Sequence, residues 1–458
     1  MLLMHFFTPK IAHSSYILAG SQTCAVIDPR RDVQVYIDAA KSLGMRITHV
    51  LETHLHADFV SGHLDLAEKT GATIYAPKSA GCAFGHVALS EGDEIAFEDI
   101  VLQVLETPGH TPEHISYVAI DTSRGTSPVG VFCGDTLFVG DVGRPDLFPG
   151  KAEELANALF SSLHDKLLKL PDFCEVLPAH GAGSLCGRAM GAKWRSTIGY
   201  ERLYNSALQI RERDEFVKSL TTNMPPAPDH FSRCSAINGK GPALVSSLPA
   251  PKELDPVQFA AEAAKENTVV LDIRPYAAFG GQHTVGAYHI DFGGNFPTFA
   301  GWIMPPDKDI LLVVPDSVRL SDVLEWSRRV GVDRVSGTLV GSLYAWAAAG
   351  LPTNHLRQLS STELNERLSS RADATLVDVR APGEYEMEHI NRAINIPVAE
   401  LRTRHVELDR AKPVMLMCST GHRSSMGASI LLHNGFEKVY NVAGGIEGYL
   451  TAGFPTNI

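Results

Sequence analysis

Short apolar runs alternate with turn residues over the first 200 positions of this 458-residue chain. Gly, Pro and Asp punctuate the runs, which have the length of strands. They predict strands at 1–8, 16–27, 73–75, 100–105, 115–120 and 129–132. Helical spacing of apolar residues predicts helices at 33–43, 61–69 and 152–168, and a closing helix at 200–220. This mixture favours an α/β architecture in which two sheets are sandwiched between helices.

The second half of the chain contains an internal repeat. Leu271–Arg274 recurs as Val377–Arg380, with Asp378 following Asp272 by 106 positions. Gly453 likewise follows Gly350 by 103 positions, within matching Ala-Gly-x-Pro-Thr segments. Each copy alternates apolar strands with helices, which predicts a doubly wound parallel sheet in both.

A Pro-, Gly- and Ser-rich passage from Met224 to Pro251 separates the two halves and is interpreted as a linker. Combined with the repeat, it predicts three domains. Their expected limits are 1–245, 252–355 and 356–458.

Composition narrows the classes of partner. The formal net charge of −12 argues against nucleic acid and against an anionic membrane surface. The sequence contains no run of about 18 apolar residues, so we expect no membrane span. Met1–Thr8 lacks the basic residues of a signal peptide. Seven cysteines, an odd number without the spacing of a small disulfide-bonded domain, favour reduced thiols and a cytoplasmic location.

Metal-binding residue types occur at four stations, each expected in a loop. The first is His54, His56 and Asp58, directly after the apolar run 47–51. The others are His110 in Thr-Pro-Gly-His-Thr, Asp135 in Cys-Gly-Asp-Thr and His180 in Pro-Ala-His-Gly. Imidazole and carboxylate side chains on loops at one sheet edge are typical of metal sites. The spacing alone leaves open whether His54 or His56 is a ligand.

These stations resemble the metallo-β-lactamase fold and, within it, the persulfide dioxygenase branch. The resemblance covers about residues 1–245 and implies an αββα sandwich that binds one Fe(II) per chain through His54, His110 and Asp135. His56 and Asp58 then lie around the ligand set, and His180 belongs to the substrate pocket. Hydrolases of this fold carry a second-metal histidine where this chain has Phe59, which favours a single metal.

Two further features near these stations suit a thiol substrate. The resemblance implies that Arg144, in Gly-Arg-Pro-Asp146, binds the substrate's carboxylate, since a guanidinium pairs with carboxylates in a bidentate way. A structural turn between Arg144 and Asp146 is the alternative. Cys186 follows His180 closely and is either a persulfide carrier or a buried apolar residue.

A second resemblance covers the C-terminal repeat. The apolar run 414–417 leads into Cys418 and then into a helix, so backbone N–H groups, the helix dipole and Arg423 favour a thiolate. This is similar to the rhodanese active-site loop, which has four residues between cysteine and arginine. The loop residues expected to bind the substrate are Ser419, Thr420, Gly421 and His422.

The first repeat has Pro315 at the position of the cysteine, and it is therefore interpreted as a degenerate rhodanese domain.

The leading hypothesis is a fusion that oxidises a low-molecular-weight thiol persulfide with O2 to sulfite. Cys418 would then link persulfide, sulfite and thiosulfate. Glutathione, coenzyme A and other small thiols all remain open as the carrier, and a homo-oligomer is expected. The alternative hypothesis is a zinc-dependent hydroxyacylglutathione-type hydrolase fused to a sulfurtransferase.

Overall fold

The computed structural model describes all residues except 189, 223, 225–227, 229, 371–372 and 457–458. The chain forms two compact units, Met1–Leu248 with Arg328–Gly331, and Pro249–Ser327 with Val332–Ile458. Part of the expected linker, 225–227, lies outside the described residues. Within the described part of the chain, no helix combines the length and the apolar character that a membrane crossing requires.

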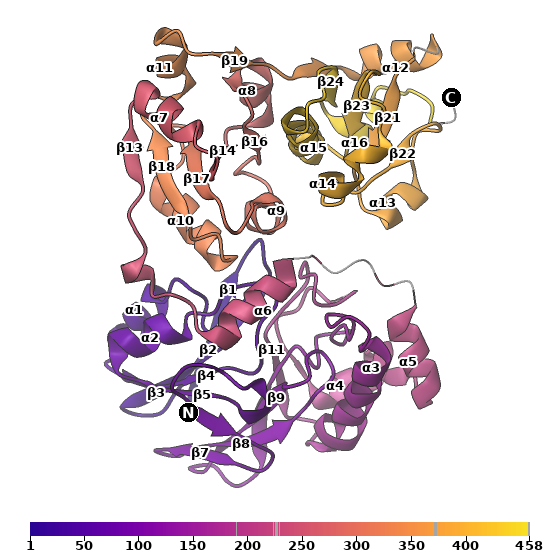
Figure 1. Ribbon diagram of the computed structural model, residues 1–458. Coiled ribbons are helices and arrows are strands. Elements are labelled where there is room, and N and C mark those ends of the chain that lie inside the picture. The colour runs from indigo at the N-terminus through magenta and orange to yellow at the C-terminus, as the bar shows by residue number, and fades with distance from the viewer. Residues whose placement is uncertain (189, 223, 225–227, 229, 371–372, 457–458) are drawn as a thin grey trace. The chain divides into compact units, whose positions relative to one another are not determined.

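Two six-stranded sheets make up the first unit (Figure 1). The first sheet has the order β1-β2-β3-β4-β5-β6, with the strands Leu2–Thr8, His13–Ala19, Thr23–Ile27, Arg46–Leu51, Thr73–Pro77 and Val87–Leu89. The second has the order β12-β11-β10-β9-β8-β7. Its strands, β7 to β12, are Glu94–Phe97, Ile100–Glu106, Ile115–Asp121, Pro128–Gly134, Glu175–Pro178 and Ser196–Thr197.

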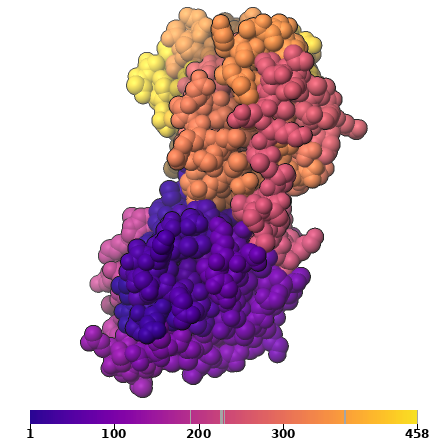
Figure 2. All heavy atoms as spheres, turned by 90° about the vertical axis from the view of Figure 1, so that its left-hand side faces the viewer, coloured from indigo at the N-terminus to yellow at the C-terminus, as the bar shows by residue number. Residues whose placement is uncertain are grey.

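The sheets pack face to face, and helices cover their outer faces. Strand β2 illustrates how: Tyr16 and Leu18 join the core with Leu102, whereas Ile17 packs outward with Tyr36. This alternation follows from the period of two along a strand. Helices α1 (Gln34–Ser42) and α2 (His63–Thr70) cover the first sheet, and α3 (Ala152–Ser161) and α5 (Arg213–Thr221) cover the second. Figure 2 shows the face formed by the N-terminal, indigo and violet segments. The αββα sandwich is thus confirmed.

Several predicted elements are divided in the structure. The expected strand at 16–27 is the hairpin β2–β3, because Gly20–Gln22 turn between the two strands. The helix expected at 152–168 is α3 followed by a π-helical turn, Ser162–Lys166, and a 3₁₀ turn, Leu167–Lys169. The closing helix expected at 200–220 is α4 (Ile198–Tyr204), a 3₁₀ turn, and α5.

The interpretation of 224–251 as a linker is wrong for much of its length. Residues His230–Lys240 form helix α6, followed by a 3₁₀ turn at Val245–Ser247. The α6 residue Asn238 donates hydrogen bonds to the carbonyls of His56 and Phe59 (both 2.8 Å) and accepts one from the Ser61 N–H (2.9 Å). This helix therefore supports the first metal-binding loop.

The second unit contains two five-stranded parallel sheets of identical order (Figure 1). The first sheet, β13-β18-β17-β14-β16, has the strands Lys252–Leu254, Val335–Leu339, Asp309–Val313, Thr268–Asp272 and Tyr288–His289. The second, β20-β24-β23-β21-β22, has the strands Arg357–Leu359, Val439–Val442, Val414–Met417, Thr375–Asp378 and Ile394–Asn395. The strand order of the first sheet is thus repeated in the second. The parallel sheets predicted from the repeat are confirmed.

Helices connect the strands at equivalent places in both repeats. The first repeat has α7 to α11 at Pro256–Ala263, Tyr276–Gly281, Phe296–Ile303, Leu320–Arg329 and Ser342–Ala348. The second has α12 to α16 at Ser361–Ser369, Pro382–Met387, Leu401–Arg404, His422–His433 and Gly445–Thr451. The proposed division at 355/356 falls between these two sets.

Candidate metal centre and sulfur-transfer loop

The four predicted stations follow strand ends of the sandwich. His54 follows β4, His110 follows β8, and Asp135 and His180 follow β10 and β11. His54 comes from one sheet and the other three from the second sheet, so packing of the two sheets brings them together. Ligand atoms of His54, His110 and Asp135 lie within 4.8 Å of one another, and all three side chains are buried.

The two imidazoles of this cluster turn the same ring atom inward. Nδ1 of His54 lies 2.9 Å from Thr53 Oγ1, and Nδ1 of His110 lies 3.0 Å from the Arg144 carbonyl. The Nε2 atoms lie 3.9 Å and 3.3 Å, respectively, from Asp135 Oδ2. Neither Nε2 has a hydrogen-bond partner among the described residues. Histidines oriented through Nδ1, with Nε2 unsatisfied, fit a metal ion.

Electrostatics also suits a metal. Burial, and then the neighbouring imidazoles of His56 and His114, hold the pKa of His54 well below its ordinary value, and burial lowers that of His110. Burial alone would raise the pKa of Asp135, but His180 and His110 hold it below its usual range. Two neutral imidazoles and one carboxylate therefore face one another at neutral pH, which is the protonation state that ligands require.

His56 points to different partners. Its Nε2 lies 3.1 Å from Asp28 Oδ1 and 3.6 Å from Glu52 Oε2. These carboxylates outweigh burial and raise the pKa of His56 above its ordinary value. The ambiguity between His54 and His56 therefore has a geometric answer: only His54 lies in the cluster with His110 and Asp135.

His180 lies between two carboxylates. Its Nδ1 is 2.8 Å from Asp135 Oδ1, and its Nε2 is 2.9 Å from Asp58 Oδ2. Burial opposes protonation, yet the two carboxylates raise the pKa of His180 well above its ordinary value. Nδ1 of His180 also lies 3.0 Å from Asp135 Oδ2, so it contacts both oxygens of the carboxylate that faces His54 and His110. Phe59, fully buried, stacks its ring near His56 at a centroid distance of 4.4 Å.

The structure gives Arg144 and Cys186 defined surroundings. The Arg144 guanidinium binds Asp146 through two hydrogen bonds (2.6 and 2.7 Å) and donates a third to the Leu185 carbonyl (3.2 Å). Cys186 is buried beside Asp58 and His180, and burial followed by the nearby carboxylates raises the pKa of its thiol well above the ordinary value. The structural turn between Arg144 and Asp146, which was the alternative interpretation, is therefore present. A role of Arg144 in substrate binding stays a prediction.

Sequence reasoning missed His114, Asp28 and Asn238. His114 Nε2 accepts the Asp135 N–H (2.9 Å), and its ring stacks on His54 with the centroids 4.8 Å apart. Burial lowers the pKa of His114 to about 3, so it is a neutral acceptor. Its spacing of four residues from His110 was the available signal. Asp28 lies 26 residues before His54, and nothing in the local sequence connects the two.

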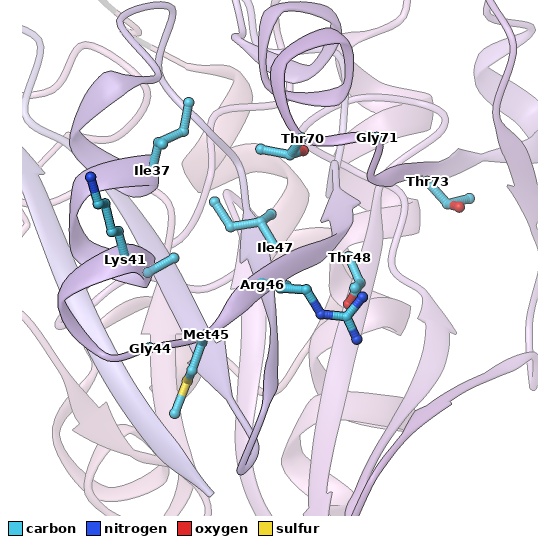
Figure 3. A pocket seen from close by; sticks show the side chains of 11 residues that line it. Ile37, Lys41, Gly44, Met45, Arg46, Ile47, Thr48, Thr70, Gly71 and Thr73 are labelled. Atoms are coloured by element: carbon cyan, nitrogen blue, oxygen red, sulfur yellow. The ribbon is translucent and has the colours of Figure 1, made fainter.

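Two hollows of this unit lie beside different parts of the sandwich. A groove of about 640 Å³ lies at the start of β4, at the opposite strand end from His54 (Figure 3). A smaller cavity of about 110 Å³ borders the metal-binding loops. It is lined by Ala57, Thr111, Leu147, Phe148, Pro149, Phe231, Ser232 and Ser235. Ala57 and Thr111 directly follow His56 and His110 in the sequence, so the smaller cavity borders two loops of the cluster.

In the second unit, strand β23 ends directly before Cys418. The Gly421 N–H and the Ser424 hydroxyl point to its Sγ at 3.1 and 3.4 Å. Gly445, with φ of +57°, backs the loop so closely that an added Cβ would lie 2.3 Å from the Cys418 carbonyl oxygen. The loop is thus built by backbone groups from both sides.

Arg423 does not point its charge at Cys418 alone. Two of its nitrogens bind Glu384 (2.6 and 2.7 Å), and Nη2 also donates to Ser419 Oγ (2.8 Å). The hydrogen bonds from Arg423 lower the pKa of Glu384 to about 2. Sequence reasoning missed Glu384, which lies 34 residues before Cys418. Thr420 and His422 are exposed at the loop surface.

Comparisons with known proteins agree with this geometry. Residues 9–173 match the metallo-beta-lactamase superfamily, and residues 360–452 match the rhodanese-like domain. Persulfide dioxygenase ETHE1 of Bos taurus is 31% identical over 240 residues, 50% of this chain and 85% of that protein. A hydroxyacylglutathione hydrolase of Rhodospirillum rubrum is 40% identical over 161 residues, but these are 34% of this chain and 57% of that protein.

A metallo-beta-lactamase structure from Staphylococcus aureus is 33% identical, with a TM-score of 0.66, over 74% of this chain and 98% of that one. The sandwich, its buried His/Asp cluster and the cysteine loop define a metalloprotein of the metallo-β-lactamase fold fused to a rhodanese-like domain. The chain belongs to the persulfide dioxygenase family. It is an enzyme that joins a dioxygenase domain to a sulfurtransferase domain.

Proposed function

We propose that the first unit oxidises a low-molecular-weight thiol persulfide with O2, and that Cys418 transfers sulfane sulfur. The observation that carries the first half is the buried set of two unsatisfied Nε2 atoms and one carboxylate. A set of two histidines and one carboxylate is the ligand pattern of non-haem iron(II) oxygenases. We therefore propose one Fe(II), held by His54, His110 and Asp135.

When bound, ferrous iron would supply open positions for the persulfide sulfur and for O2, with the electrons that O2 activation needs. The protein's own residues fix the donors. Thr53 and the Arg144 carbonyl orient the two imidazoles, and His180 holds Asp135.

The overall reaction balances as RSSH + O2 + H2O giving RSH, sulfite and two protons. The persulfide sulfur is oxidised, O2 is reduced, and the thiol leaves with the proton. The 110 Å³ cavity beside the metal-binding loops is smaller than a typical pocket for a whole ligand, so it suits the reacting end of a persulfide. Binding of a substrate carboxylate at Arg144 would require Asp146 to share the guanidinium.

Sulfur transfer uses the second unit. The Cys418 thiolate attacks a sulfane sulfur, and the S–S bond to the donor breaks as one forms to Sγ. Sulfite then attacks the outer sulfur, which releases thiosulfate and restores the thiolate. The Gly421 N–H and the Ser424 hydroxyl are positioned to stabilise the anionic sulfur in both states.

The test is metal analysis of anaerobically purified protein together with O2 uptake on glutathione persulfide. We expect iron near one per chain, and loss of both iron and O2 uptake in His110→Ala. The matched control is His164→Ala, at a partly buried histidine outside the cluster, which should keep both. A folded His110→Ala protein with wild-type O2 uptake would contradict the ligand assignment.

The hydrolase alternative rests on the hydroxyacylglutathione hydrolase relatives. It predicts two zinc ions per chain and hydrolysis of a hydroxyacylglutathione thioester. Phe59, which cannot bind a metal, favours the single-metal dioxygenase instead. The three-domain division, a homo-oligomer and a reducing, cytoplasmic location remain predictions. The seven cysteines, none of which forms a disulfide in the described structure, suit a reducing location.

A further inference from the structure

The first repeat, which lacks a cysteine at position 315, contacts the sulfur-transfer loop of the second repeat. Asp291, in the loop after β16, places Oδ2 at 3.1 Å from Nδ1 of His422. The Tyr276 ring meets the His422 ring edge-on, with the centroids 5.0 Å apart. Both contacts reach the loop at His422, four positions after Cys418, and both come from the same repeat.

The contact with Tyr276 also reaches the backbone that holds the sulfur. A Cβ added to Gly421 would lie 3.3 Å from Tyr276 Cζ, so the ring packs against this residue. The N–H of Gly421 is the group that donates to Cys418 Sγ at 3.1 Å. Tyr276 therefore packs against the residue whose N–H donates to the reacting sulfur atom.

Asp291 is itself held rigidly. Its Oδ1 accepts the Gly293 N–H at 2.9 Å, and its Oδ2 accepts the Tyr276 N–H at 3.3 Å. The side chain is only 10% exposed, whereas the His422 side chain is 44% exposed. A fixed, mostly buried carboxylate thus orients a ring that is open to substrate.

The same repeat anchors the helix that begins at His422. His289 Nδ1 lies 3.0 Å from Ser425 Oγ, and the His289 N–H donates to Ser429 Oγ at 2.9 Å. Farther along, the His433 ring stacks on Tyr288 with the centroids 4.3 Å apart. Helix α15 is thus held along its length, so the geometry at His422 is fixed from both directions.

Charge distribution gives His422 its role. Arg423, the other basic residue of the loop, has two nitrogens bound to Glu384, which neutralises much of its charge. When both ring nitrogens of His422 carry protons, Nδ1–H donates to Asp291 and Nε2–H remains to donate to a substrate. Thiosulfate and sulfite are anions whose oxygens accept such bonds.

We propose that the first repeat supplies Asp291 and Tyr276 as positioning residues of the Cys418 site. They orient His422 so that Nε2 binds the oxygens of an anionic sulfur substrate, thiosulfate or sulfite. This inference rests on the proposed sulfur transfer at Cys418. It gives the repeat without a cysteine a role in substrate recognition.

The test is a double-mutant cycle in the full chain with Asp291→Asn and His422→Ala, with thiosulfate as donor and cyanide as acceptor. An asparagine has one acceptor oxygen, which cannot serve both Gly293 and His422. We expect each single variant to raise KM for thiosulfate by roughly three- to tenfold, the size of one lost hydrogen bond, with kcat nearly unchanged. The double variant should resemble His422→Ala alone, because Asp291 acts through His422.

The matched control is Asp316→Asn, the same change at an exposed aspartate of the same repeat, which should leave KM unchanged. Wild-type KM in Asp291→Asn, or effects that multiply in the double variant, would overturn the inference. If Asp291→Asn fails to fold, Asp291→Glu takes its place in the cycle with the same coupling expected. Absence of sulfur transfer in the folded wild type would instead count against the proposed function.

Discussion

In the first repeat of the second unit, strand β17 ends at Val313 and leads to Pro315, whereas in the second repeat β23 ends at Met417 and leads to Cys418. A buried Asp–Arg pair nearby is alike in both repeats. Asp272 binds Arg274 at 2.6 Å, and Asp378 binds Arg380 at 2.7 Å, in both cases on a buried strand end. Each arginine also donates to a carbonyl eight residues onward. The buried pair therefore belongs to the scaffold, and the loop chemistry can be lost without it.

The largest effect is expected from a substitution in the loop that carries Cys418, which the loop with Pro315 should not be able to replace. Cys418→Ser should abolish sulfur transfer, because a serine hydroxyl stays protonated near neutral pH and forms no S–S bond. O2 uptake on persulfide should persist, and the product should change from thiosulfate to sulfite, as product chromatography would measure. Adding Pro315→Cys should not restore transfer, since helix α10 begins only at Leu320. Thiosulfate formed by Cys418→Ser at the wild-type rate would make Cys186 the next carrier to test.

The second expectation concerns what the repeats share. Asp378→Ala and Asp272→Ala should each destabilise their repeat by about 3–5 kcal/mol, because each leaves a buried guanidinium without its carboxylate. Denaturant unfolding measures this. Tryptophan fluorescence reports on the first repeat through Trp302, Trp326 and Trp346, above a contribution of Trp194 in the first unit, whereas circular dichroism reports on the whole chain. Clearly unequal losses would mean that the scaffolds are not equivalent.

A third expectation uses one backbone position. Gly445 has φ of +57° and the equivalent Ser342 has φ of +58°, yet only Gly445 lies against the cysteine loop. Gly445→Ala should push the Cys418 carbonyl away and lower kcat for sulfur transfer on the order of 10²-fold, as a displacement of about 1 Å can. Steady-state assays measure this, and near-wild-type kcat would mean that the loop tolerates the displacement.

The fourth expectation is a pH effect present only in the second repeat. The pKa of Glu384 is lowered from 4.5 to about 2 by Arg423, so its stabilising contribution is complete above 4.5. It is lost as pH falls through 2, when the folded carboxylate becomes protonated. Glu384→Gln should therefore flatten the dependence of the unfolding midpoint on pH between 4.5 and 2. An unchanged slope would assign that dependence to other carboxylates.

The smallest effect is expected at the counterpart of Gly445. Ser342→Gly removes a side chain from a left-handed backbone position, which relieves strain, but glycine also gains entropy in the unfolded chain. The net change should be a stabilisation below about 1 kcal/mol, without any change in sulfur transfer. A loss of sulfur-transfer activity in Ser342→Gly would mean that this turn of the first repeat affects Cys418, which its position does not indicate.

The sequence was sufficient for the sandwich and the repeat, because strand alternation and the repeated segments are local signals. Loop motifs also pointed to His54, His110 and Asp135, which the structure brings together and whose role as ligands stays a prediction. The sequence could not choose between His54 and His56, which differ by two positions and follow the same strand. That choice depends on Asp28, which lies 28 positions before His56, and on Glu52, which lies four positions before it. Glu384, Asp291 and Asn238 were missed for the same reason: each acts on a residue more than 30 positions away.

The inward-facing Nε2 atoms of His54 and His110 also affect how much of this protein a cell holds. Both are buried without a hydrogen-bond partner in the described structure, which costs the folded state free energy. A metal that binds only the folded chain stabilises it by about 1.4 kcal/mol for each tenfold excess over its dissociation constant. Chains made when the metal is scarce would unfold more often and be degraded sooner. The abundance of the protein, and not only its activity, would then follow the metal supply.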